Sequence, residues 1–145
     1  MNKLNVAFVK ANWHKDVVNQ ALEGFRQELA AQNVDAEINV LDVPGAFEMP
    51  LQAKRLALTG KYDAIVCAAL VVDGGIYRHD FVAQAVVDGL MNVQLETNVP
   101  VFSVSLTPHN FQPAEEFTQF YHQHFIKKGA EAARAAVAIA NLVVE

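Results

Sequence analysis

The chain contains a single cysteine among its 145 residues and has no long uninterrupted apolar stretch. One cysteine excludes an internal disulfide framework, so we expect a reducing, cytoplasmic location. No apolar run approaches the roughly 20 residues that a membrane-spanning helix needs. The first ten residues also lack the apolar core of a secretory signal. We therefore expect no membrane partner.

Positive charge is scarce as well. The chain has 11 Lys and Arg against 16 Asp and Glu, a formal net charge of -5, which argues against a nucleic-acid partner. Apolar residues are abundant in contrast, at 52%, above the usual share for a soluble monomer. The length suits one domain, residues 1–145, with a sizeable core. The surplus of apolar residues predicts subunit interfaces.

Alternating strand and helix patterns predict an α/β three-layer sandwich around a four-stranded parallel sheet. The strands are expected at Leu4–Val9, Asp35–Val43, Tyr62–Leu70 and Pro100–Leu106. The helices are expected at about Lys15–Gln32, Glu48–Thr59, His79–Thr97 and Lys127–Leu142. A polar and aromatic segment, Thr107–Phe125, precedes the last helix. The inner face of that helix is expected to include Ala130, Ala133, Val137 and Ala140.

The third predicted helix carries apolar residues on more than one side. Val86 and Leu90 repeat at helical spacing, and Val87 and Met91 follow the same spacing on another side. A helix of this kind is buried on more than one side. In a chain this small, the second neighbour could be another subunit.

The loops that follow parallel strands all lie at one edge of the sheet, where α/β proteins bind ligands. The unusual residues gather in these loops, Ala11–His14, Val43–Glu48, Val71–His79 and Thr107–Asn110. We therefore expect the functional site at this edge.

The loop after the third strand combines two glycines with ionisable side chains. Gly74 and Gly75 permit a positive φ and a close approach of backbone N–H groups to a ligand, and the helix start that follows attracts anions. His79 can carry protons, whereas Arg78 stays protonated and can bind phosphate. In the alternative interpretation, Arg78, His79 and Asp80 form only a solvated helix start.

Two aromatic residues and a glutamate also have two interpretations each. Trp13 could stack on a planar ring or pack at the rim of its own domain. Glu48 could bind the N–H donors of a pyrimidine or the hydroxyls of a polyol, or it could complement a helix dipole. Phe47, taken alone, would be a core residue.

The cysteine and the histidines give weaker signals. Cys67 lies inside an apolar strand and is expected in the core rather than as a nucleophile. The histidines lack regular ligand spacing apart from His122 and His124, so we expect no metal.

Several segments, in order along the chain, carry a resemblance to a known family. They are Val43–Pro50, Lys61–Val66, the valine–glycine loop with Asp80–Val82, Lys127–Gly129 and the Ala-Asn-Leu near the end. The chain resembles 6,7-dimethyl-8-ribityllumazine synthases over essentially its whole length. It is most similar to the type II enzymes, which share Trp-His near the start and Gly-Gly-Ile-Tyr-Arg-His-Asp in the loop.

The resemblance implies a flavodoxin-like fold and a transferase of riboflavin biosynthesis. The enzyme condenses 5-amino-6-(D-ribitylamino)uracil with 3,4-dihydroxy-2-butanone 4-phosphate to 6,7-dimethyl-8-ribityllumazine, with loss of phosphate and water. No metal or redox cofactor is implied. The family assembles as pentamers, sometimes paired into decamers or built into shells, with active sites between neighbouring subunits.

The resemblance also implies roles for individual residues. Trp13 matches the aromatic residue that stacks on the pyrimidine. The ribityl chain and ring are held by residues matching Ala46, Phe47 and Glu48. The backbone facing the pyrimidine matches Leu70, Val71 and Val72. The loop that receives the phosphate matches Gly75 and Ile76, and Lys128 matches a lysine near the phosphate pocket.

Three departures from the family pattern concern catalysis and phosphate binding. Arg78 stands where most of the family has the catalytic histidine, and His79 comes one residue late. Ile76 replaces a threonine that donates to the phosphate. The family's phosphate-binding arginine has no counterpart between Thr107 and Phe125, which contains no Arg or Lys.

Several residues could compensate for the missing arginine. His122 or His124 could take its place, or Arg78 could supply the charge. In addition, Ser103 stands at the end of the fourth strand, where the family has an aromatic residue. We therefore expect a slower enzyme with weaker affinity for the phosphorylated ketone.

Two other functions compete with this one. A flavin- or lumazine-binding assembly with little catalytic activity would use the same pocket, and the replacement at Arg78 favours it slightly. A generic flavodoxin-like binder of phosphate or nucleotides would leave the Val43–Pro50 segment unexplained.

Overall fold

The computed structural model describes residues 3–12, 14–71, 79–106 and 115–142, with the backbone alone described at 79–80, 106 and 115–119. The strands are β1 (Leu4–Ala11), β2 (Ala36–Val43), β3 (Ala64–Leu70) and β4 (Val101–Leu106). The helices are α1 (Lys15–Ala31), α2 (Met49–Ala57), α3 (His79–Thr97) and α4 (Glu115–Ala140). A short 3₁₀ turn, η1 (Ala46–Glu48), leads into α2.

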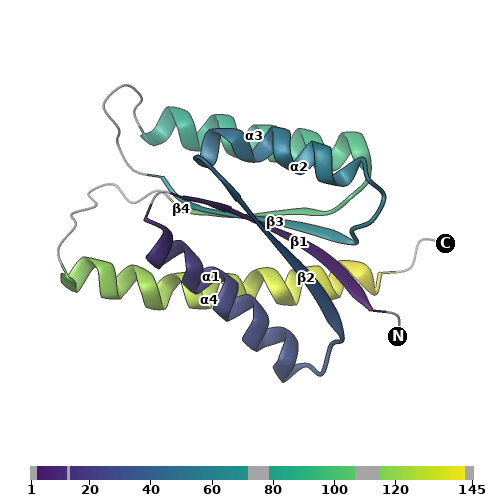
Figure 1. The fold of residues 1–145 in the computed structure, drawn as a ribbon, viewed down its shortest axis with the longest axis horizontal. Helices are drawn as coiled ribbons and strands as arrows, with labels where there is room; N and C mark the ends of the chain where they lie inside the picture. The colour runs from purple at the N-terminus through teal and green to yellow at the C-terminus, as the bar shows by residue number, and fades with distance from the viewer. Residues whose placement is uncertain (1–2, 13, 72–78, 107–114, 143–145) are drawn as a thin grey trace.

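The four strands form one parallel sheet in the order β2-β1-β3-β4. Helices α2 and α3 cover one face, and α1 and α4 cover the other (Figure 1). This confirms the predicted three-layer sandwich, and the strand order is that of the flavodoxin-like folds. In the described part of the chain, no helix is long and apolar enough to cross a membrane.

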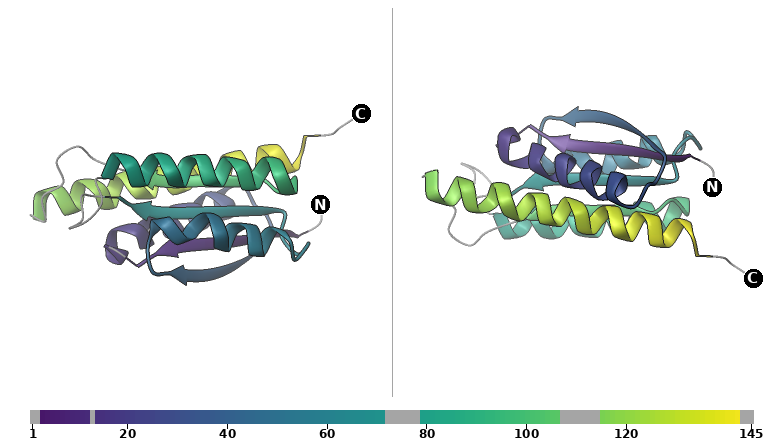
Figure 2. Two further views of the ribbon diagram at one scale, coloured as in Figure 1. Left: turned by 90° about the horizontal axis from the view of Figure 1, so that it is seen from above. Right: turned by 90° about the horizontal axis from the view of Figure 1, so that it is seen from below.

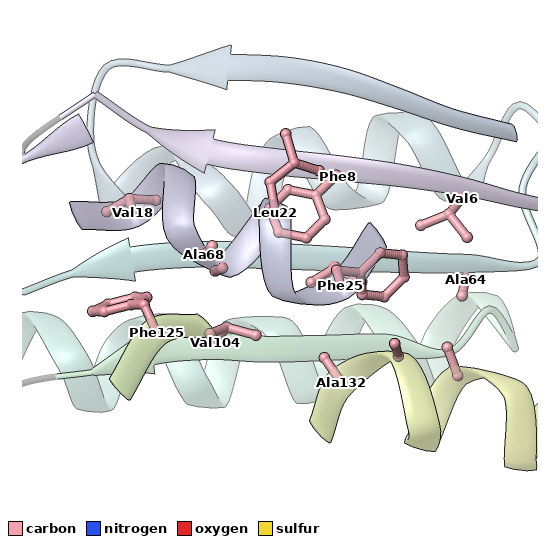
Figure 3. Packing of buried hydrophobic residues seen from close by; sticks show 14 of the residues in the cluster. Val6, Phe8, Val18, Leu22, Phe25, Ala64, Ala68, Val104, Phe125 and Ala132 are labelled. Atoms are coloured by element: carbon pink, nitrogen blue, oxygen red, sulfur yellow. The ribbon is translucent and has the colours of Figure 1, made fainter. Parts of the chain in front are cut away.

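Strand β3 lies at the centre of the fold, and all seven of its residues are buried. Its side chains alternate between the two faces, so Val66 and Ala68 join one core while Ile65 and Cys67 join the other. The core under α1 and α4 contains Phe8, whose ring packs edge-to-face on Phe25 with the ring centroids 5.5 Å apart (Figure 3).

Helices α1 and α4 touch through their backbones. A Cβ atom on Gly24 would lie 1.9 Å from the carbonyl oxygen of Ile126, and one on Gly129 would lie 1.9 Å from the carbonyl oxygen of Ala21. The view from below in Figure 2 shows α4 running along the molecule beside α1. These two glycines therefore set how closely α4 approaches α1.

The last helix begins earlier than predicted. Helix α4 starts at Glu115 instead of Lys127, so half of the segment expected to precede it is helical. The reason is packing, because Phe125 is fully buried and Tyr121 packs against the same core. The predicted inner face of this helix was also partly wrong. Ala133 is buried as predicted, but Ala132 and Ala136 complete the face while Ala140 is exposed.

The third helix has the predicted bounds and the predicted surplus of apolar surface. Val86, Leu90 and Val93 are buried against the sheet. Met91 is 50% exposed and Leu95 is 70% exposed. Helix α3 therefore presents a second apolar side that its own chain does not cover.

The contact between α1 and α4 predicts that Gly24→Ala lowers the free energy of unfolding. In an exposed helix this substitution stabilises by about 1 kcal/mol. Here the added methyl group meets backbone, so we expect the free energy of unfolding to fall by about 1–3 kcal/mol. Urea unfolding measures it, with Gln27→Ala on the exposed side of α1 as the control. An increase in stability for Gly24→Ala would contradict the close contact.

Candidate functional site

The carboxyl ends of the four parallel strands meet at one edge of the sheet. The loops after β1 and β2 begin side by side there, because the backbone N–H of Asn12 donates a hydrogen bond to the carbonyl oxygen of Val43 at 3.0 Å. The predicted site residues that leave β1, β2 and β3 therefore start from a common edge.

The η1 turn displays two of its three side chains to solvent. Ala46 is partly buried and packs against the core under α2 and α3. Phe47 is 61% exposed, so its interpretation as a core residue was wrong; the 3₁₀ turn directs the ring outward. Glu48 is exposed and makes no side-chain cap for α2. Its carboxylate lies over Gly45, where a Cβ atom would come within 3.3 Å of Oε1.

Leu70 ends β3 at this edge and Val71 follows it, and their side chains are buried, only 2% and 6% exposed. Because these side chains fill the two cores, a ligand at the edge can reach only the backbone groups of the two residues. This arrangement is compatible with the backbone role that the family resemblance gives them.

Ser103 lies on β4, paired in register with Cys67, and it is exposed. Its Oγ accepts a hydrogen bond from the backbone N–H of Ser105 at 3.3 Å. The Oγ of Ser105 itself is buried and has no hydrogen-bond partner among the described residues. The face of β4 toward α3 is therefore polar near its carboxyl end, where the family has an aromatic residue.

Two predicted phosphate-binding residues lie on one side of α4. Phe120, His124 and Lys128 follow one another at four-residue spacing, and the rings of Phe120 and His124 stack with centroids 5.8 Å apart. The Lys128 ammonium donates a hydrogen bond to Glu131 at 3.1 Å and lowers the pKa of that carboxyl below its usual value. Lys128 is therefore already paired within its own helix.

His122 points to a different partner. Its Nε2 atom is buried and lies 3.5 Å from the carboxylate of Asp16 on α1, without a hydrogen bond. Of the two histidines proposed to replace the family arginine, only His124 shares a side of α4 with Lys128. The choice between His122 and His124 stays a prediction, and the contact with Asp16 favours His124.

The structure does not bring the two groups of predicted residues together in one chain. The η1 turn packs on the face covered by α2 and α3, whereas α4 covers the opposite face (Figure 1). Among the described residues, the candidate site residues therefore fall into two groups on opposite faces of the sheet, which we call half-sites.

Other predicted site residues lie outside the described part of the structure. They are Trp13, Val72, Gly75, Ile76 and Arg78. His79 is the first residue of α3, and its backbone alone is described. The choice between Arg78 and His79 as the residue that faces the substrate therefore stays a prediction.

Sequence reasoning missed Lys10, whose side chain is only 14% exposed near the end of β1. Its ammonium donates a hydrogen bond to Asn19 at 2.6 Å and lies 3.5 Å from Asp42. The available signal was a lysine interrupting the apolar run of the first strand.

Among the described residues, no three or more His, Cys, Asp or Glu side chains gather closely enough to hold a metal ion. A cavity of about 260 Å³ lies at the opposite, amino edge of the sheet and is lined by Lys3, Asp63 and Asn141 among others.

Comparison with known proteins identifies the class of protein. The family model of 6,7-dimethyl-8-ribityllumazine synthase matches residues 3–144. This chain belongs to that family.

Individual relatives agree with this assignment. The 6,7-dimethyl-8-ribityllumazine synthase of Rhodococcus erythropolis is 57% identical over 131 residues, covering 90% of this chain and 84% of the relative. A 6,7-dimethyl-8-ribityllumazine synthase 2 of Pseudomonas syringae pv. tomato is 58% identical over 139 residues, covering 95% and 82%. A protein of the same name from Bradyrhizobium diazoefficiens is 53% identical over 130 residues, covering 90% and 78%.

Cys67 is confirmed as a core residue, and its chemistry can be tested directly. Complete burial raises the pKa of its thiol to about 12. We expect almost no reaction of the native protein with a thiol reagent at pH 8 and one thiol per chain in guanidinium chloride. Because an unfolded thiol ionises near pH 9.0, stability falls as pH rises above that value. Stoichiometric labelling of the native protein would contradict the burial.

Proposed function

We propose that this chain condenses 5-amino-6-(D-ribitylamino)uracil with 3,4-dihydroxy-2-butanone 4-phosphate to 6,7-dimethyl-8-ribityllumazine, in riboflavin biosynthesis. The observation that carries this function is the family match over residues 3–144, together with relatives of this name at 57% and 58% identity. The location is proposed to be the cytoplasm.

The pyrimidine substrate occupies the carboxyl edge of the sheet on the side of η1. In this proposal Trp13 stacks on the ring, while Phe47 and Glu48 hold the ring and the ribityl chain. The exposure of Phe47 and Glu48 supports the role, because an aromatic face and a carboxylate are both presented to solvent at this edge. The backbone of Leu70, Val71 and Val72 faces the other side of the ring.

The phosphate of the second substrate binds to His124 and Lys128 on α4, with the backbone of Gly75 and Ile76. The shared side of α4 supports the first two assignments. Glu131 already holds the Lys128 ammonium at 3.1 Å, so phosphate must compete with a carboxylate. This competition is a physical reason for weak affinity toward the phosphorylated ketone.

The chemistry requires no cofactor in this proposal. The amino groups of the pyrimidine join the carbon chain of the ketone, and inorganic phosphate and water leave. Holding two substrates in register supplies much of the acceleration in such a reaction. Arg78 and His79 are proposed to assist proton transfer and to neutralise the phosphate.

The active site is proposed to lie between copies of the chain in a pentamer, which can pair into a decamer. The two half-sites on opposite faces of one chain support this, because a second copy is needed to join them. Exposed apolar side chains on α2 and α3, such as Leu51 at 56% and Leu95 at 70%, supply surface for the contacts. Light scattering should give about 80 or 160 kDa for chains of 15.9 kDa; a mass near 16 kDa would contradict the assembly.

A turnover assay tests the function directly. Purified, folded protein with both substrates at saturation should form 6,7-dimethyl-8-ribityllumazine, followed by its absorbance. A riboflavin titration that follows the fluorescence of Trp13, the only tryptophan, runs in parallel. Tight flavin binding without any turnover would replace the enzyme with a flavin-binding assembly.

Substitutions on α4 test the phosphate half-site. His124→Ala and Lys128→Ala should each raise the KM for the butanone phosphate about tenfold, because each removes a charged or polar phosphate contact. The matched control is His122→Asn, which faces Asp16 and should change this KM less than twofold. The assignment fails if the control has the same effect as the two test variants, or if none of the three changes the KM.

A further inference from the structure

Lys10 is a nearly buried cation that neither the fold nor the proposed chemistry explains. It stands in β1 between Val9 and Ala11, both buried apolar residues. Burying an ammonium group costs free energy unless it is paired, and apolar replacements of buried ion pairs are often neutral or stabilising. The lysine therefore requires a reason other than core stability.

The position of Lys10 in the sheet suggests that reason. In the sheet register it stands opposite Asp42 of β2 and Ala68 of β3. The next rung, Ala11 opposite Val43, is the last before both strands leave the sheet. The ammonium thus sits one rung below the two loops that carry Trp13 and the η1 turn.

The contacts of Lys10 join three elements at this point. Its hydrogen bond to Asn19 at 2.6 Å reaches the second turn of α1, and its ion pair with Asp42 at 3.5 Å reaches β2. One side chain thereby links the end of β1 to β2 and to the start of α1. The hydrogen bond from Asn12 to Val43 extends the same constraint into the loops.

We propose that Lys10 is a positioning residue for the pyrimidine half-site. It acts through the spacing of the β1–α1 loop and the β2–η1 loop, and it does not touch the substrate. The proposal rests on the proposed function. Small displacements of substrate-holding groups cost large factors in rate and binding, so loss of this constraint weakens pyrimidine binding.

The test compares Lys10→Met with a matched charge removal elsewhere. Methionine keeps the unbranched stem and removes the ammonium, and it leaves no buried charge because Asp42 is 58% exposed. The control is Lys54→Met, which breaks the 3.4 Å ion pair with Glu96 between α2 and α3. Because α3 ends at Thr97, this pair lies toward the amino edge of the sheet. Asn19→Ala removes the 2.6 Å hydrogen bond while Lys10 stays in place.

The readouts separate positioning from stability. Lys10→Met and Asn19→Ala should raise the KM for the pyrimidine, and its Kd followed by Trp13 fluorescence, about five- to tenfold. The KM for the butanone phosphate should change little in both variants, the thermal midpoint of Lys10→Met should change little, and Lys54→Met should match the parent protein. An unchanged pyrimidine Kd in the first two variants, or equal rises for both substrates with a lower thermal midpoint, overturns the proposal. Absence of turnover in the parent protein would instead reject the proposed function, and the binding comparison would still decide the role of Lys10.

Discussion

The parallel pairing of β1 with both of its neighbours is the constraint on which the rest of the structure depends. Register places Ala11 opposite Val43, and β3 and β4 continue in the same direction on the other side. Every strand therefore ends at one edge, and every following segment starts there. If one strand ran in the opposite direction, the segment that follows it would start at the opposite edge, away from the other candidate site residues.

The helix layers decide what each face adds to that edge. Close contact between α1 and α4 through Gly24 and Gly129 holds α4 against one face of the sheet. His124 and Lys128 belong to this helix. The η1 turn belongs to the other face. This separation of the candidate residues supports the proposal that a second copy of the chain completes the site, and the surplus of apolar residues favours the same assembly.

Sequence patterns predicted the sheet, the layers and the bounds of α3, because periodic apolar residues follow directly from secondary structure. They failed at the start of α4, since a helix there depends on Phe125 and Tyr121 packing onto a distant core. The outward direction of Phe47 and the partners of Lys10 depend on tertiary structure in the same way. The close approach of α4 to α1 could not be predicted from the sequence either, because a glycine in a helix does not indicate which residues contact it.

A crystal structure with a non-reactive pyrimidine analogue would show whether the carboxyl edge of the sheet is the active site. We expect the ring beside Phe47 and Glu48 of one copy, with His124 and Lys128 of a second copy completing the site. The same structure will show whether Arg78 or His79 faces the analogue. Binding of the analogue in the cavity at the amino edge, beside Lys3 and Asp63, would exclude the carboxyl edge as the pyrimidine site.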